Sequence, residues 1–349
     1  MNKLFFCGVA LAALTLAGCS NDEVVQSPVT AEKAISFADA FIGKLTKTDA
    51  VDPTAESLNN LLEISVYGYQ GTDKLFDNQK VTRESSTAEW TYSPLKYWAD
   101  GKSYTFVALG NFGVDADSNT LADGTITTVV KGFISDGKTD ALASNLAKAE
   151  NVDIERTDPV KFDLNHVLSK VKFTFENGFG ETDDVTLQVT DVKITDAYAT
   201  GNVSIVAGTD FEATWSDQGI DTLSLEFGDT QKITSAAVTG EGYVQTKDVA
   251  ANERLLIPSP DTKDYTVTFT VHVLANAGTD NEFEMTTYDH TATISGAAFE
   301  PGYAYNLLAA INASNVNPEK EAKPITFTVN SIVDWNDAED DVEFPAEEE

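Results

Sequence analysis

Four polar side chains within residues 115–123 have the spacing of a calcium-binding loop. They stand at positions one, three, five and nine of an EF-hand-like pattern: Asp115, Asp117, Asn119 and Asp123. However, Thr120 replaces the glycine that the sharp turn needs, and Ile126 replaces the bidentate glutamate. We interpret the segment as an acidic surface turn, with a weak external calcium site as the alternative.

The remaining polar residues give no catalytic constellation. His166 and His290 are far apart in the sequence and outside any HExxH motif, and His272 lies on the threonine face of a strand-like segment. The acidic run 334–344 contains paired carboxylates, but such a run near a terminus is typical of a solvated surface. There is no GxSxG, P-loop or GxGxxG sequence. We predict no enzyme and no cofactor.

Cys19 follows an apolar segment in the pattern of an exported lipoprotein. Lys3 and the apolar run 4–17 have the layout of a secretory signal peptide, and the run is too short to span a bilayer. The sequence Leu16-Ala17-Gly18-Cys19 matches the lipobox of bacterial lipoproteins. We predict a lipoprotein signal peptide over 1–18 and a lipid on Cys19; an ordinary signal peptide with an unrelated cysteine is the alternative.

Composition narrows the function classes further. Cys7 would leave with the signal peptide, so one acylated cysteine would remain, which excludes disulfides, thiol nucleophiles and cysteine-ligated zinc. The formal charge of −33 excludes a basic nucleic-acid-binding groove. A hydrophobic fraction of 42% with 10% aromatic residues is typical of a folded, exported protein rather than a disordered one.

Strand patterns dominate the elements that would position these residues. In the segment 264–275, DYTVTFTVHVLA, apolar residues alternate with threonines, which predicts an antiparallel strand with one wet face. Similar alternation occurs at 103–109, 169–175, 221–227, 303–311 and 324–329. Turn-forming clusters of Gly, Asn and Asp separate these segments. The sequence predicts an all-β protein.

One or two short helices are expected beside the strands. In TDALASNLAKAENV, residues 139–152, Asp140 is a candidate N-cap and Leu142 and Leu146 share one helix face. A weaker candidate is 54–63.

The polar stretch around Pro159 separates two series of strands, which predicts an N-terminal β-sandwich domain over 35–158 and a C-terminal one over 159–349. Residues 19–34 read as a flexible tether.

The chain resembles the fimbrillin family of Bacteroidales, whose members build type V pili or related fibres. Four segments carry the resemblance: the lipobox at Cys19, ISFADAFIGKLTKT (35–48), FDLNHVLSKVKFTF around His166, and a closing series containing Gly302, Tyr303 and Trp335. The resemblance implies two tandem transthyretin-like antiparallel β-sandwich domains. It also implies a lipidated precursor that an external trypsin-like protease cuts after a basic residue, so that the first strand is lost and a strand of a neighbouring subunit replaces it.

On this chain the expendable first strand covers Ile35, Phe37 and Phe41, and cleavage is expected after Lys44 or Lys47. The candidate donor is the segment 325–344, which carries alternating and further apolar anchors: Ile325, Phe327, Val329, Ile332, Trp335, Val342 and Phe344. The alternative is that these residues form the last strands of their own domain.

The resemblance departs from the family at the cleavage point, where members usually offer arginine. Here only lysines follow the first strand, and Arg83 comes too late. We expect a structural fimbrial subunit at the outer membrane and cell surface, with other fimbrial subunits as partners and adhesion to a host or bacterial surface ligand as its role. The alternatives are a pilus anchor or accessory subunit that keeps its lipid, and a non-polymerising surface lipoprotein that binds glycan or a host ligand.

Overall fold

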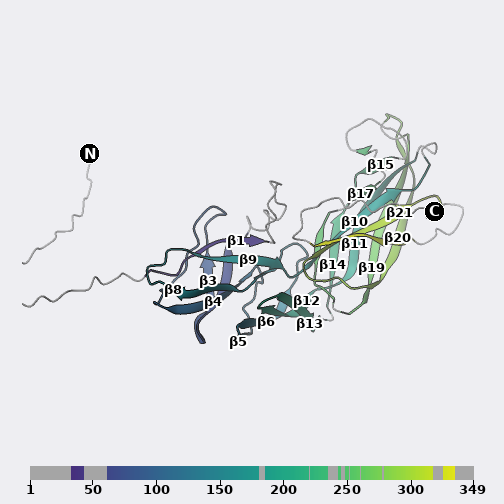
Figure 1. Ribbon diagram of the computed structural model, residues 1–349. Coiled ribbons are helices and arrows are strands. Elements are labelled where there is room, and N and C mark those ends of the chain that lie inside the picture. The colour runs from purple at the N-terminus through teal and green to yellow at the C-terminus, as the bar shows by residue number, and fades with distance from the viewer. Residues whose placement is uncertain are drawn as a thin grey trace, which may run out of the picture. The chain divides into compact units, whose positions relative to one another are not determined.

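The computed structural model of the 349-residue chain describes residues 33–42, 61–180, 185–219, 221–234, 243–244, 248–250, 252–259, 261–276, 279–316 and 325–334. Over these ranges the protein consists of strands and contains no helix, which confirms the all-β class (Figure 1). The described ranges accordingly offer no helix with the length and apolarity to cross a membrane.

The first sheet has seven strands in the order β1-β9-β7-β4-β2-β3, with β8 also beside β4. Its strands are β1 Phe37–Ile42, β2 Glu63–Gln70, β3 Asp73–Thr82, β4 Lys102–Gly110, β7 Leu142–Ser144, β8 Ala147–Val152 and β9 Val160–His166. Neighbouring strands run antiparallel, except that β1 runs parallel to β9. Among the described strands β1 is therefore an edge strand, with β9 as its one neighbour in the sheet.

A four-stranded sheet in the order β13-β12-β6-β5 packs against the first sheet. Its strands are β5 Ser118–Ala122, β6 Thr125–Ile134, β12 Thr200–Ala207 and β13 Phe211–Ser216. Tyr67 and Val107 of the first sheet share one buried cluster with Ile126 and Ile205 of this sheet, so the two sheets form a β-sandwich. β9 and β12 follow residue 158 yet pair with strands that precede it, and the division into domains at that residue stays a prediction.

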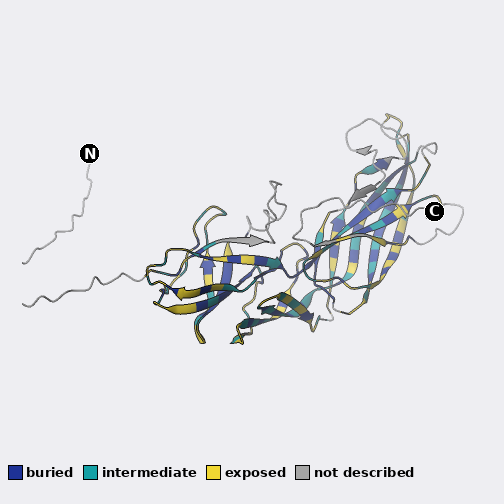
Figure 2. Ribbon diagram, in the orientation of Figure 1, coloured by how far each residue is buried: buried dark blue, intermediate teal, exposed yellow. Residues whose placement is uncertain are grey.

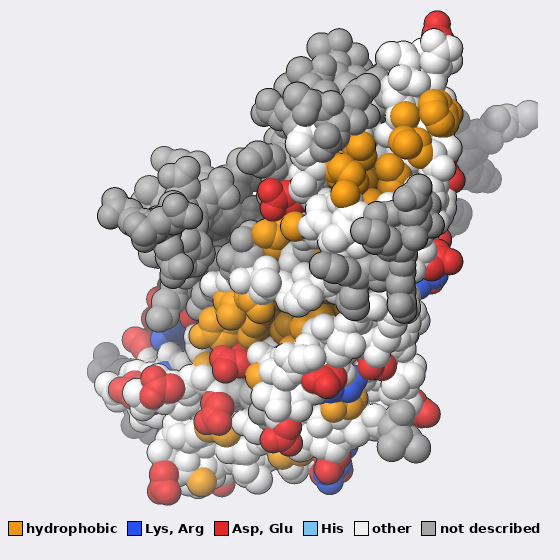
Figure 3. All heavy atoms as spheres, turned by 90° about the vertical axis from the view of Figure 1, so that its right-hand side faces the viewer, with side chains coloured by type: hydrophobic (Ala, Val, Ile, Leu, Met, Phe, Trp, Pro, Cys, Tyr) orange, Lys and Arg blue, Asp and Glu red, His pale blue; other side chains and the backbone are white. Residues whose placement is uncertain are grey.

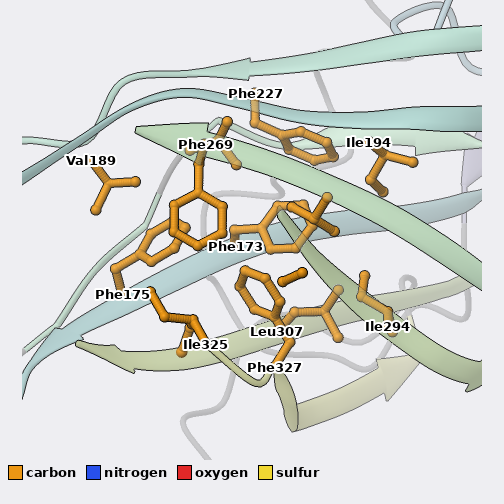
Figure 4. Packing of buried hydrophobic residues seen from close by; sticks show 14 of the residues in the cluster. Phe173, Phe175, Val189, Ile194, Phe227, Phe269, Ile294, Leu307, Ile325 and Phe327 are labelled. Atoms are coloured by element: carbon orange, nitrogen blue, oxygen red, sulfur yellow. The ribbon is translucent and has the colours of Figure 1, made fainter. Parts of the chain in front are cut away.

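Two further sheets enclose the largest hydrophobic cluster. The five-stranded sheet, in the order β17-β10-β21-β22 with β18 beside β10, contains β10 Ser169–Asn177, β17 Asp248–Ala250, β18 Arg254–Leu256, β21 Tyr303–Ile311 and β22 Thr328–Asp334. The six-stranded sheet, in the order β16-β15-β11-β19-β20 with β14 beside β11, contains β11 Thr186–Tyr198, β14 Thr222–Gly228, β15 Lys232–Thr234, β16 Tyr243–Val244, β19 Lys263–Ala275 and β20 Phe283–Ala297. Figure 4 shows side chains of both sheets meeting in this core.

The alternation of residue types explains these strands. Along β19, Tyr265, Val267 and Phe269 point into the core while Thr266 and Thr268 stay partly exposed. Apolar side chains on one face of a pleated strand are buried against the facing sheet, and the other face stays in contact with water. Figure 2 shows this alternation of buried and more exposed residues along the strands.

The predicted strands at 103–109, 169–175, 221–227, 264–275 and 303–311 are confirmed by β4, β10, β14, β19 and β21. The last prediction, 324–329, is confirmed only in part, because β22 begins at Thr328 and the described residues before it are not in a strand.

The predicted helix over 139–152 is wrong. The segment forms β7 and β8, and Asp140 does not cap a helix; its carboxylate lies 2.6 Å from His166 Nδ1. Leu142 is buried together with both of its neighbours because Leu142 packs in one hydrophobic cluster and Ala141 and Ala143 pack in another, on the opposite face of the sheet. Burial on both faces removes the alternation by which a strand is recognised, so the leucine spacing suggested a helix instead. The weaker candidate, 54–63, lies mostly outside the described residues, and its last residue, Glu63, begins β2.

A two-residue connection joins β9 to β10. Val167 and Leu168 are fully buried there. The indole of Trp215 donates to the Val167 carbonyl at 2.7 Å, and the Gly302 N–H donates to the Leu168 carbonyl at 2.9 Å. Gly302 has a φ of 77°, which favours glycine. The passage of the chain from the first sheet to the five-stranded sheet is thus fixed by hydrogen bonds as well as by packing.

Replacing Phe173 tests the core of the C-terminal sheets. This side chain is fully buried, with its ring 4.7 Å from that of Phe227 and 5.0 Å from that of Phe327. We expect Phe173→Ala to lower the free energy of unfolding by about 3–5 kcal/mol, because it removes apolar contacts and leaves a cavity. The measurement is urea denaturation followed by tryptophan fluorescence. Phe283→Ala, at a side chain that is 54% exposed, is the matched control and should change stability by less than ~0.5 kcal/mol.

Candidate functional site

The first strand is built into the core of the first sheet. Ile35 and Phe37 are 1% and 5% exposed, whereas Ser36 between them is exposed. Figure 1 shows β1 beside β9. The ladder pairs Phe37 with Val160 and Ala38 with Lys161, and a register shift follows before Phe41 pairs with Asp163. The strand β1, Phe37–Ile42, covers most of the predicted segment, Ile35 lies just before it, and the side chains of Ile35 and Phe37 are buried. The prediction that this strand is expendable stays a prediction.

Aromatic rings surround Phe37. Its ring stacks on Phe162 with centroids 5.7 Å apart, and it makes edge contacts with Phe76, Tyr92 and Phe106 at 5.7, 5.5 and 6.2 Å. Edge-to-face and offset-stacked pairs at these separations are favourable beyond the burial of area. We call these four residues the Phe37 cage.

Hydrogen bonds from two directions hold the backbone of residues 33–36. The Ile35 N–H donates to the Lys96 carbonyl at 2.8 Å, and Val160 donates to the Ser36 carbonyl at 2.8 Å. The Tyr92 hydroxyl donates to the Ile35 carbonyl at 2.7 Å. Burial raises the pKa of this hydroxyl, so it remains a protonated donor. All three bonds reach main-chain groups of Ile35 and Ser36, just before β1, so they do not depend on the side chains at these positions.

The beginning of the candidate donor segment lies in the C-terminal core of its own chain. Ile325 and Phe327 are buried, and Thr326 between them is exposed. The Phe327 ring makes edge contacts with Phe173, Phe175 and Phe269 at 5.0, 5.9 and 5.8 Å (Figure 4). We call these three residues the Phe327 cage.

The next residues form the edge strand β22, where Val329 and Ile332 are 52% and 55% exposed. β22 pairs only with β21 among the described strands. Figure 3 shows that hydrophobic side chains gather in separate patches on one face of the molecule, with acidic side chains between many of them. An edge strand with exposed apolar side chains is able to pair with a further strand.

Several predicted site residues lie outside the described residues. These are the lipid-attachment residue, the two cleavage residues and the distal donor anchors: Cys19, Lys44, Lys47, Trp335, Val342 and Phe344. For Phe41 the structure describes the backbone pairing only.

The residues of the calcium pattern do not come together. Asp115 pairs with Lys80 at 3.3 Å, and Asp117 pairs with Lys131 at 2.8 Å. Asn119 is buried and accepts a hydrogen bond from Tyr69. Hydrogen bonds from Asn78 and Lys80 lower the pKa of Asp115.

Asp123 and Gly124 form the two-residue turn between β5 and β6, both with positive φ, as a type I′ hairpin requires. In the described part of the chain, no group of three or more His, Cys, Asp or Glu side chains is placed to hold a metal ion.

The histidines occupy three separate environments. His166 is buried at the end of β9 beside Asp140, with 2.6 Å between Nδ1 and the carboxylate oxygen. His272 lies between Glu284, at 2.8 Å, and Thr190, at 2.9 Å. His290 stacks on Phe269 with centroids 5.4 Å apart. The Asp140–His166 pair is a buried polar contact that residue spacing did not reveal, because Asp140 lies just before β7 and His166 lies at the end of β9.

The described features define an all-β sandwich protein in which β1, an edge strand among the described strands, contributes to a core. A fimbrillin-like family model matches residues 48–335, and the chain belongs to that family.

One solved structure shares the fold at low sequence identity. A fimbrial protein from Bacteroides vulgatus is 15% identical with a TM-score of 0.52, over 86% of this chain and 99% of that one. A candidate cell adhesion protein from Bacteroides uniformis is 18% identical with a TM-score of 0.46, over 88% of this chain and 99% of that one. No curated protein matches the sequence.

The contribution of the first strand can be measured with Phe37→Ala. Because Phe37 fills its cage, we expect a loss of about 3–5 kcal/mol in the free energy of unfolding. Urea denaturation followed by tryptophan fluorescence reports it, since Trp90 and Trp98 lie in the same cluster. Leu95→Ala, at a side chain that is 51% exposed in the adjoining segment, should change stability by less than ~0.5 kcal/mol. Equal effects of the two variants would contradict the assigned role of Phe37.

His290 should make stability depend on pH. Burial lowers the pKa of its imidazole below the ordinary value of 6.5, with Asp289 opposing the shift. The unfolded chain therefore binds the proton more readily, so this contribution to stability is complete above pH 6.5 and decreases as the pH falls toward the folded-state pKa. We expect His290→Phe, which keeps a ring on Phe269, to lose less stability than the parent between about pH 7.5 and 5.5 in urea titrations. If the variant and the parent lost the same stability over this pH range, His290 would not be the source of the pH dependence.

Proposed function

We propose that this protein is a structural subunit of a cell-surface fimbria. In this proposal it is exported as a lipoprotein, loses its first strand by proteolysis, and polymerises by accepting a strand from a neighbouring copy. Membership of the fimbrillin-like family supports a fimbrial or adhesive role and gives no support to an enzymatic one. We also propose that the sandwiches are tandem transthyretin-like domains, as the family resemblance implies.

The observation that carries the proposal is the position of the first strand. It lies at a sheet edge, so it can leave without breaking the order of the other strands. It also contributes Ile35 and Phe37 to the core, and their burial is worth roughly 3–6 kcal/mol together. Its loss would expose the Phe37 cage and the unpaired backbone of β9, which favours the binding of another strand.

The C-terminal segment is the proposed donor. A donated strand supplies main-chain hydrogen bonds along its length and places alternate side chains in the acceptor's pockets. Donation requires Ile325 and Phe327 to leave their own core, so in this proposal the segment packs in its own domain until it is exchanged. Because donor and acceptor surfaces differ, repeated exchange gives an open fibre rather than a closed dimer.

The proposed life cycle begins at the outer membrane. A lipid on Cys19 would hold the precursor there, and cleavage after Lys44 or Lys47 would release the tether together with all of β1, which ends at Ile42. Other fimbrial subunits are then the partners, and a host or bacterial surface ligand is the target of adhesion. The high negative charge disfavours nucleic acid as a partner.

A second candidate role is an anchor or accessory subunit that keeps its lipid. It is favoured by the basic residues that directly follow the first strand, which are lysines rather than arginines. An arginine-specific protease would leave this segment intact, and the first strand would then stay in its own groove. A non-polymerising lipoprotein that binds glycan or a host ligand is the alternative in which no exchange occurs.

Limited proteolysis distinguishes these roles. We expect a lysine-cleaving protease to trim the purified protein after Lys44 or Lys47, and ladders resistant to SDS to follow as trimmed copies exchange strands. Intact mass and gel electrophoresis measure the two steps. The double variant Lys44→Gln, Lys47→Gln should remain untrimmed and monomeric. An arginine-specific protease should leave the segment after β1 uncut in the parent and in this variant alike.

Deleting residues 325–349 tests the donor. The shortened chain should be trimmed normally and form no ladder with itself. A ladder that survives the deletion would show that the donor lies elsewhere in the chain. A parent that is trimmed cleanly but stays monomeric would contradict the fimbrial proposal and favour the binding lipoprotein.

A further inference from the structure

Two short segments at opposite ends of the described chain share a pattern. The segment that leads into β1 contains Ile35-Ser36-Phe37, and the C-terminal segment contains Ile325-Thr326-Phe327. In both, the isoleucine and the phenylalanine are buried while the hydroxyl residue between them is exposed. In the sequence an isoleucine follows each phenylalanine by five residues, at Ile42 and Ile332. The two segments therefore share an Ile-x-Phe pattern with the same two buried positions, whereas Phe41 of the first segment aligns with Ser331 of the second.

The two phenylalanines also have similar surroundings. Phe37 is enclosed by the Phe37 cage, and Phe327 by the Phe327 cage, with ring centroids 5.5–6.2 Å apart in the first and 5.0–5.9 Å apart in the second. Protein interiors are closely packed, so a replacement of equal volume and shape fits a core without repacking its neighbours. The side chains of Ile325 and Phe327 therefore match those of Ile35 and Phe37 in type and spacing.

The hydrogen-bonding groups around residues 34–37 can also bind the backbone of the C-terminal segment when Ile325 takes the place of Ile35. The hydrogen bonds from Tyr92 and Val160, and the bond to Lys96, involve only main-chain groups of Ile35 and Ser36. Pro324 precedes Ile325 and has no N–H, and it corresponds to Ala34 in this alignment. The bridge between Ala34 and Tyr97 is made by the Ile35 and Trp98 N–H groups, and among the described residues the Ala34 N–H has no acceptor. A proline at that position therefore breaks no bond of the groove.

We propose that Ile325 and Phe327 of one copy occupy the places of Ile35 and Phe37 in a neighbouring copy, with the donated strand parallel to β9. The groove thus selects a strand with isoleucine and phenylalanine two residues apart, and Thr328 of the donor lies opposite Lys161 of the acceptor, as Ala38 does in the unprocessed chain. This register rests on the proposed strand exchange.

Cysteine pairs test the register. The background is the full chain with Cys7→Ser and Cys19→Ser, so that the introduced cysteines are the only thiols. One copy carries Thr328→Cys and a differently tagged copy carries Lys161→Cys; both positions are exposed. Neighbouring strands lie about 4.8 Å apart, within the range that a disulfide bridges. The matched control replaces Thr328→Cys by Thr326→Cys, which is displaced by roughly 6.6 Å along the strand and lies out of range.

Both mixtures are trimmed by the lysine-cleaving protease and oxidised, and mixed-tag disulfides are identified by mass spectrometry. We expect at least a tenfold excess of the Thr328–Lys161 crosslink over the control. A ladder in which the control pair links as well or better would overturn the register while leaving strand exchange intact. Trimming without any ladder would overturn the strand exchange, and the register with it.

Discussion

The structure depends on the insertion of aromatic side chains from edge strands into cores that contain no covalent cross-link among the described residues. Phe37 stacks on Phe162 of β9, and the rest of its cage comes from β3, β4 and the loop between them. Removing one edge strand therefore opens a core rather than only an edge. The same arrangement recurs at the end of the described chain, where Phe327 enters a core through a segment that precedes an edge strand.

This constraint explains how a subunit can be stable and ready to exchange. A central strand is held by ladders on both sides and cannot leave without disrupting the sheet. Among the described strands β1 has a ladder on one side only, and the residues just before it make a few hydrogen bonds to the segment around Lys96. Burial of Ile35 and Phe37 holds it in place, and burial of equivalent side chains would stabilise a donated strand in the same position. The burial that holds the first strand in place would thus also favour the binding of a donated strand after the first strand is lost.

The connection between β9 and the C-terminal sheets gives the groove a firm base. Val167 and Leu168 are buried and hydrogen-bonded, and His166, just before them, lies against Asp140. β9 is consequently fixed at its end while β1 pairs along its length. A groove whose wall is rigid can select a donor by side-chain fit, because little of the wall can rearrange to accept another pattern.

The sequence by itself determined the all-β class, because alternating apolar and threonine residues, as in β19, permit little else. It also located Ile35 and Phe37 as core residues of a first strand, and Ile325 and Phe327 as apolar anchors. Only the tertiary structure decided the rest. Leu142 was assigned to a helix because burial on both faces hides strand alternation. The segment around Asp123 was interpreted as an acidic surface turn, and the structure gives its geometry, a two-residue hairpin turn of Asp123 and Gly124. The contact of Asp140 with His166 and the cages around Phe37 and Phe327 join residues far apart in the chain, and local patterns carry no information about which strands become neighbours.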